Sequence, residues 1–65
     1  MNRDKLKAAI VEKGKTQMDV ANYLGITPKT FYLKMKKGVF GTDEVQKMIE
    51  LLDIKNPIEI FLAKK

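Results

Sequence analysis

The chain has 65 residues, 13 of them lysine or arginine and eight aspartate or glutamate, which gives a formal net charge of +5. It contains neither cysteine nor histidine, so a disulfide-stapled secreted module and a zinc site built on cysteine and histidine are excluded. No apolar run approaches the roughly 18 residues that a membrane-spanning helix needs, and the charged, amphipathic start does not resemble a signal peptide. We therefore expect one small cytoplasmic domain over residues 1–65.

The first predicted helix runs from about residue 3 to residue 13. Asn2 is a favourable N-cap, and Asp4 lies near the positive end of the helix dipole. Gly14 follows at the position where the helix should end. The apolar stripe expected to face the core consists of Leu6, Ala9 and Ile10.

Two short helices joined by a tight turn are predicted in the middle of the chain. Thr16 and Asp19 approximate a capping box at the start of the first, and Gly25 lies where a left-handed C-cap is needed. Thr27 followed by Pro28 is a second start signal, an N-cap and then proline at the first helical position. The inward residues expected on the pair are Val20, Ala21, Leu24, Phe31 and Met35. A helix, a glycine-containing turn and a second helix are the outline of a helix-turn-helix.

Gly38 should end the second helix of this pair, and residues 39–42 should form a loop. Val39 and Phe40 in this loop have two interpretations. They fold under a small core as a plug, or they belong to a contact between subunits.

The fourth helix should start at Gly41 or Thr42 and end near Asp53. Asp43 and Glu44 lie in its first turn, where capping and dipole chemistry explain them more simply than acid–base catalysis. The expected inward stripe is Val45, Met48, Ile49 and Leu52.

A last, short helix is predicted over about residues 57–63. Asn56 as N-cap, Pro57 at the first position and Glu59 at the third form its start signal. The side chains expected to face inward are Ile58, Phe61 and Leu62. The sequence thus predicts an all-α fold, a compact five-helix bundle that contains a helix-turn-helix.

The central pair also resembles a known family. Its residues Gln17, Ala21, Gly25, Ile26 and Phe31 look like the signature of phage Cro and CI-type helix-turn-helix regulators, in which glutamine, a small residue, the turn glycine and a hydrophobe follow at this spacing. The resemblance extends over nearly the whole chain and is closest to short Cro-like or repressor-modulator proteins of Gram-positive phages. It implies a lambda-repressor-like fold and a role in regulating transcription, without specifying an operator.

Four lysines lie between Asp19 and Asp43, a stretch that has no acidic residue. They are Lys29, Lys34, Lys36 and Lys37. A positive patch on a helix-turn-helix is the footprint expected for a polyanion. The alternative is that these lysines only solvate an exposed helix.

The outward face of the third helix is the predicted reading face, because a helix fits the major groove of B-DNA. The predicted base contacts are Thr27, Lys29, Thr30, Tyr32 and Leu33. The predicted phosphate contacts are Lys34, Lys36, Lys37 and, by resemblance to the family, Gln17 with the amides that open the second helix. The third helix has no arginine, which is the favoured bidentate partner of guanine. Its central Leu33 suits a protein partner as well as a groove.

Two functions follow from these observations. The first is a sequence-specific regulator that binds an operator in double-stranded DNA as a homodimer, associated with the nucleoid of the host cell. The candidate dimer residues are Val39, Phe40, Leu51 and Ile60. The second is a phage modulator of repression that keeps the fold but binds another repressor through Tyr32, Leu33 and the lysines.

No cofactor and no enzymatic activity are expected, because no clustered inward polar set offers a nucleophile with a base. RNA is a weaker alternative, since the two tyrosines and three phenylalanines do not form a stacking platform.

Overall fold

The structure is a computed structural model that describes residues 1–62. The five helices are α1 (Arg3–Glu12), α2 (Gln17–Leu24), α3 (Pro28–Lys37), α4 (Thr42–Leu52) and α5 (Pro57–Phe61). No strand occurs in this part of the chain, so the prediction of an all-α, five-helix fold is confirmed. The Cα radius of gyration is 10.5 Å, with principal extents of 26 × 23 × 19 Å.

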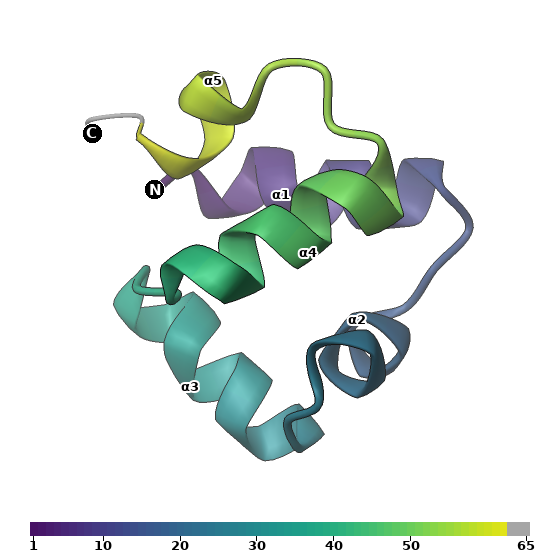
Figure 1. Cartoon of the computed structure of the whole chain (residues 1–65), viewed down its shortest axis with the longest axis vertical. Helices are drawn as coiled ribbons and strands as arrows, with labels where there is room; N and C mark the ends of the chain where they lie inside the picture. Colours follow the sequence, from purple (N-terminus) through teal and green to yellow (C-terminus); the bar gives the residue numbers. More distant parts are fainter. Residues whose placement is uncertain (63–65) are drawn as a thin grey trace.

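Helix α4 crosses the middle of the molecule, with α1 behind it and with α2 and α3 below (Figure 1). Helix α2 packs against both α3 and α4, and α1 packs against α5. The start of the chain is tied to α5, because the amide of Asn2 donates to the carbonyl of Ile60 at 2.7 Å. The α2–α3 pair is therefore held on a small body built by the other three helices.

Local capping chemistry explains where three helices begin. The Asn2 side chain accepts from the amide of Lys5. The predicted capping box is present at α2, since Thr16 accepts from the Asp19 amide at 3.1 Å and Asp19 accepts from the Thr16 amide at 2.8 Å. Thr27 caps α3 by accepting from the amide of Thr30. These N-caps are confirmed.

The last helix differs from its predicted form. Asn56 holds the N-cap position, but its side chain makes no capping bond and donates instead to Glu59 at 2.8 Å. The helix ends at Phe61, and the predicted end at Ala63 lies outside the described residues. Ile60 is the buried residue of this helix, whereas Ile58 is 66% exposed and Leu62 is 71% exposed. The predicted inward set was therefore wrong for Ile58 and Leu62.

The core lies between α1, α2, α3 and α4 and is closed by α5. Its buried residues are Leu6, Ile10, Val20, Ala21, Leu24, Phe31, Met35, Met48, Leu52 and Ile60. The predicted stripes of α2 and α3 are confirmed in full, while Ala9, Val45 and Ile49 on the other helices are only half-buried.

The structure of the loop after α3 shows which of its two apolar residues, Val39 and Phe40, folds under the core. Phe40 packs on the core with its ring centroid 5.5 Å from that of Phe31, whereas Val39 is 66% exposed. The plug is therefore Phe40 alone. Ile60 was also a candidate dimer residue, and that prediction is wrong because only 7% of Ile60 is exposed.

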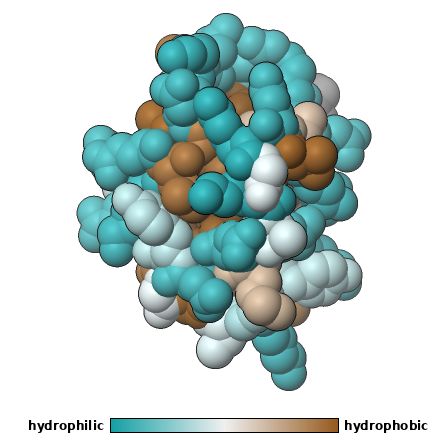
Figure 2. Space-filling view, turned by 90° about the vertical axis from the view of Figure 1, so that its right-hand side faces the viewer, coloured by the Kyte–Doolittle hydropathy of each residue, from teal (hydrophilic) through white to brown (hydrophobic). Residues whose placement is uncertain are grey.

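The side on which α2 lies is mainly hydrophilic, apart from an apolar recess in its upper half (Figure 2). Among residues 1–62, none of the helices has the length and apolar character needed to cross a membrane.

Candidate nucleic-acid interface

The turn between α2 and α3 is closed by backbone hydrogen bonds. Gly25 adopts the left-handed conformation at φ 78°, which costs glycine little because it has no Cβ. The amide of Ile26 then donates to the carbonyl of Ala21 at 3.0 Å, and the Ile26 side chain packs against the core. Thr27 and Pro28 follow at once as N-cap and first position of α3. The turn therefore sets the direction in which α3 leaves α2.

Helix α3 is buried through one narrow stripe. Phe31 and Met35 are 1% and 3% exposed. The exposed side chains of α3 are Pro28, Lys29, Tyr32, Leu33, Lys36 and Lys37. The predicted outward face of the helix is thus the observed one, while its contacts with DNA stay a prediction.

Three lysines on this face are free of ion pairs. Among residues 1–62, Lys29, Lys36 and Lys37 have no carboxylate within 4.0 Å. Elsewhere in residues 1–62, Lys5, Lys13 and Lys55 are paired with carboxylates, whereas Lys7, Lys15 and Lys47 are not. Helix α3 therefore carries three of the six lysines of the described chain that have no carboxylate partner.

Lys34 belongs to a different environment. Its Nζ lies 2.6 Å from Oε2 of Glu44 on α4, and the side chains are 35% and 15% exposed. The amide of Gly41 donates to the other oxygen, Oε1, at 2.8 Å. The hydrogen bond from Lys34 is the largest cause of the lowered pKa of Glu44. Lys34 therefore joins α3 to α4, and its charge is already compensated, unlike that of the other three lysines.

The two threonines predicted to contact bases bond to each other. The Thr27 hydroxyl accepts from the Thr30 amide at 3.1 Å and donates to the Thr30 hydroxyl at 2.9 Å. The Thr27 hydroxyl is thus engaged in the cap and with Thr30, and Thr30 is half-buried, so both hydroxyls already have partners within α3.

Gln17 is exposed at the first position of α2. The amides of Gln17 and Met18 have no intrahelical acceptor at this position, so they can donate to an anion. The carboxylate of Asp19 already accepts from Thr16, and this backbone hydrogen bond lowers the pKa of Asp19. A phosphate near Gln17 would have to sit beside that negative charge.

Two residues important for α3 were missed by the sequence reasoning. Nη1 of Arg3 donates to the carbonyl of Lys36 at 3.1 Å, so α1 places a cation at the carbonyl end of α3. Glu44 was assigned only to the start of its own helix, yet it also holds Lys34. Neither contact has a local signal, because the partners are 33 and 10 residues apart.

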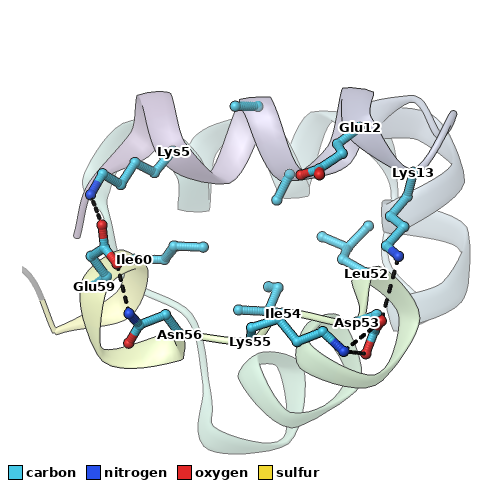
Figure 3. Close-up of a pocket in the computed structure, with 12 residues that line it drawn as sticks. Lys5, Glu12, Lys13, Leu52, Asp53, Ile54, Lys55, Asn56, Glu59 and Ile60 are labelled. Atoms are coloured by element: carbon cyan, nitrogen blue, oxygen red, sulfur yellow. Dashed lines mark hydrogen bonds and ion pairs between the residues drawn. The ribbon is translucent and has the colours of Figure 1, made fainter.

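A hollow of about 340 Å³ lies away from α3, between α1 and residues 52–60. Its floor includes Leu52, Ile54 and Ile60, while ion pairs of Lys5 with Glu59 and of Lys13 with Asp53 bridge its two ends (Figure 3). The charged groups in these two ion pairs compensate each other at the rim of the hollow. The pairs therefore connect α1 with residues 53 and 59. Within residues 1–62 no cluster of acidic side chains could hold a metal ion.

Comparisons of the chain with models of known families, with curated proteins and with solved structures found no match.

Proposed function

We propose that this protein is a sequence-specific, DNA-binding transcription regulator of the Cro and repressor type, whose α2–turn–α3 unit is a helix-turn-helix in a lambda-repressor-like fold. The observation that carries the proposal is the outward face of α3. It presents Lys29, Lys36 and Lys37 without carboxylate partners in the described chain, on a helix held by the buried stripe of Phe31 and Met35.

The positions of these lysines suit two kinds of contact with a duplex. Lys29 lies in the first turn of α3, where a helix in the major groove reaches base edges, and it can donate to guanine O6 and N7. Lys36 and Lys37 lie in the last turn, where ammonium groups can neutralise phosphates and fix the register.

Two copies on a two-fold-symmetric operator are the expected arrangement. A single domain of this size offers a small interface, and dimeric helix-turn-helix proteins bind half-sites one turn of DNA apart. We therefore assign homodimers on double-stranded DNA as the working form.

Selection of binding sites from a random duplex library tests this function. We expect the protein to enrich a short symmetric motif, and a labelled duplex with that motif to bind more tightly than a scrambled duplex at the same salt concentration. The variant Lys29→Gln/Lys36→Gln should lose this binding. Its matched control is Lys7→Gln/Lys47→Gln, which removes the same charge from exposed lysines on α1 and α4 that have no ion pair within residues 1–62. No enrichment, together with no retardation at low salt, would refute the proposal.

A second candidate is a modulator that binds another repressor protein. The observation in its favour is that Tyr32 and Leu33 are 58% and 45% exposed on the same face as the lysines. If this function holds, Leu33→Asp should abolish co-purification with a partner repressor, while Met18→Asp, at an apolar position on α2 that is 58% exposed, should not. Retained co-purification of Leu33→Asp would count against this surface.

A further inference from the structure

The only arginine of the chain, Arg3, lies beside the last turn of the predicted reading helix. Its Nη1 donates to the carbonyl oxygen of Lys36 at 3.1 Å, although the two residues are 33 positions apart. The start of α1 and the end of α3 accordingly lie on the same side of the molecule (Figure 1). The fold thus adds a guanidinium group to the end of α3 that already carries Lys36 and Lys37.

The backbone around Arg3 is held in place on both sides. The amide of the preceding Asn2 donates to the carbonyl of Ile60 at 2.7 Å, and the Asn2 side chain caps α1. Met1 lies directly beside Gly38, which ends α3, because a Cβ added to Gly38 would be 3.7 Å from the Cβ of Met1. Arg3 therefore projects from an anchored part of the fold, so ordering it at an interface costs less conformational entropy.

Positive charge gathers at this end of α3 without compensation from the described chain. Among residues 1–62, no carboxylate forms an ion pair within 4.0 Å with Arg3, Lys36 or Lys37. Arg3 is also the first residue of α1, where a positive charge is unfavourable for that helix. A group of cations from two helices is the electrostatic footprint of a polyanion.

We propose that Arg3 contacts the phosphodiester backbone of DNA, at the end of α3 opposite Lys29. This inference rests on the proposed function, because it adds a residue to the same interface. A guanidinium group has five N–H donors in a planar fork that fits two phosphate oxygens. The hydrogen bond to the Lys36 carbonyl uses one nitrogen of Arg3 and leaves donors on the others for a phosphate.

The attachment of Arg3 to α3 gives this contact a role in orienting the helix. Backbone contacts fix the register of a protein on the duplex without reading sequence, and in homeodomains the C-terminal end of the reading helix lies against the backbone. Because Arg3 bonds to the main chain of α3, a phosphate held by Arg3 also fixes the end of that helix. Helix α1 thus supplies the arginine that α3 lacks, for the backbone and not for a base.

NMR provides a direct test, since a chain with one arginine gives one side-chain Nε–Hε signal of this type. Titration of the full chain with a short duplex of arbitrary sequence at low salt should shift the Arg3 signal as the complex forms. An unchanged Arg3 signal, while backbone amides of α3 shift, would overturn the inference and leave the DNA-binding proposal standing. No shift of any signal would refute both.

Salt titrations of two variants separate a phosphate contact from support of the helix end. Arg3→Gln should weaken binding of selected and scrambled duplexes alike, by about fivefold at roughly 0.15 M salt. It should also reduce the slope of log affinity against log salt by about 0.9, the contribution of one phosphate. Arg3→Lys keeps the charge and should restore the slope. A residue that only supports α3 would alter the preference for the selected duplex and leave the slope unchanged.

Lys47→Gln is the matched control, because it removes one charge from an exposed position of α4 that has no ion pair within residues 1–62. It should leave the slope close to that of the wild type, and circular dichroism checks that each variant is folded. A wild-type slope in folded Arg3→Gln would overturn the inference, as would equal reductions in Arg3→Gln and Lys47→Gln.

Discussion

The lysines of α3 differ in whether a neighbouring carboxylate already compensates their charge. Lys34 and Lys36 are two positions apart, but only Lys34 reaches a carboxylate, that of Glu44. Lys29, near the other end, has no such partner in the described chain. The unpaired lysines can exchange water and small counterions for phosphate or base edges, whereas Lys34 would first have to leave Glu44.

Replacing Lys29 with alanine should therefore affect recognition more than folding. We expect Lys29→Ala to weaken binding to the selected duplex by about 1–3 kcal/mol and to relax sequence preference at one position of each half-site. Fluorescence anisotropy with a set of single-substitution duplexes measures both effects. Lys7→Ala, which removes an exposed lysine from α1, should change neither. Equal losses from the two variants would mean that Lys29 supplies only general charge.

At the scale of the helix, α3 packs on the core through a single narrow row of buried side chains, Phe31 and Met35. Phe31 is 1% exposed and contacts the loop through Phe40, while the adjacent Tyr32 is 58% exposed. The contrast between neighbouring aromatic residues makes a matched pair of variants.

Phe31→Ala should lower the free energy of unfolding by about 3–5 kcal/mol, since it leaves a cavity in a small core. That is a large part of the total stability of a domain, roughly 5–15 kcal/mol. Tyr32→Ala should cost far less. Chemical denaturation followed by circular dichroism measures both values, and a normal transition for Phe31→Ala would show that α3 does not pack through this residue.

The contact between α3 and α4 should be sensitive to acid. Lys34 lowers the pKa of Glu44 from its ordinary value of 4.5. A carboxyl group whose pKa is lower in the folded state adds stability above its ordinary pKa, and this contribution is lost as the pH falls through the lowered pKa. Glu44→Gln should remove that part of the pH dependence, on the order of 1 kcal/mol for a partly exposed pair.

Unfolding free energies measured at several pH values between neutrality and strong acid test this expectation. Asp19 and Asp53 also have lowered pKa values, through Thr16 and Lys55 respectively, so some acid sensitivity should remain in the variant. Glu50→Gln, on the exposed side of α4, serves as the control. A profile of Glu44→Gln that superimposes on the wild-type profile would contradict the assigned role.

At the scale of the whole molecule, the unpaired lysines should make the affinity for duplex DNA depend on the salt concentration. Each phosphate neutralised by a lysine releases counterions, so the logarithm of the affinity should fall linearly with the logarithm of the salt concentration. Lys36→Ala and Lys37→Ala should each reduce the magnitude of this slope by about 1, nearly independently of the duplex sequence. Titrations at several salt concentrations measure the slope. An unchanged slope in both variants would remove these lysines from the interface.

Helix limits in this protein could be predicted because their causes are local. Asn2, Thr16 and Thr27 each reach an amide three residues ahead, and Gly25 and Gly38 take up left-handed conformations within one turn of the helix they end. Such contacts depend on a few consecutive residues. The helical spacing of the apolar positions likewise predicted which side of α2 and α3 is buried. It thereby also predicted which lysines of α3 are exposed.

Other features depend on partners that are distant in the sequence and meet only when the helices pack. The pairing of Lys34 with Glu44 and the hydrogen bond from Arg3 to the end of α3 are of this kind. The orientation of α5 is another, because a five-residue helix has too few turns for periodicity to define a face. The bond from Asn2 to Ile60 and the packing of α5 on α1 turn Ile60 inward and leave Ile58 in solvent. The amino-acid order by itself thus determined the helices and the buried side of α3, whereas tertiary packing decided which lysines remain unpaired in the described chain and which apolar groups of residues 57–62 stay exposed.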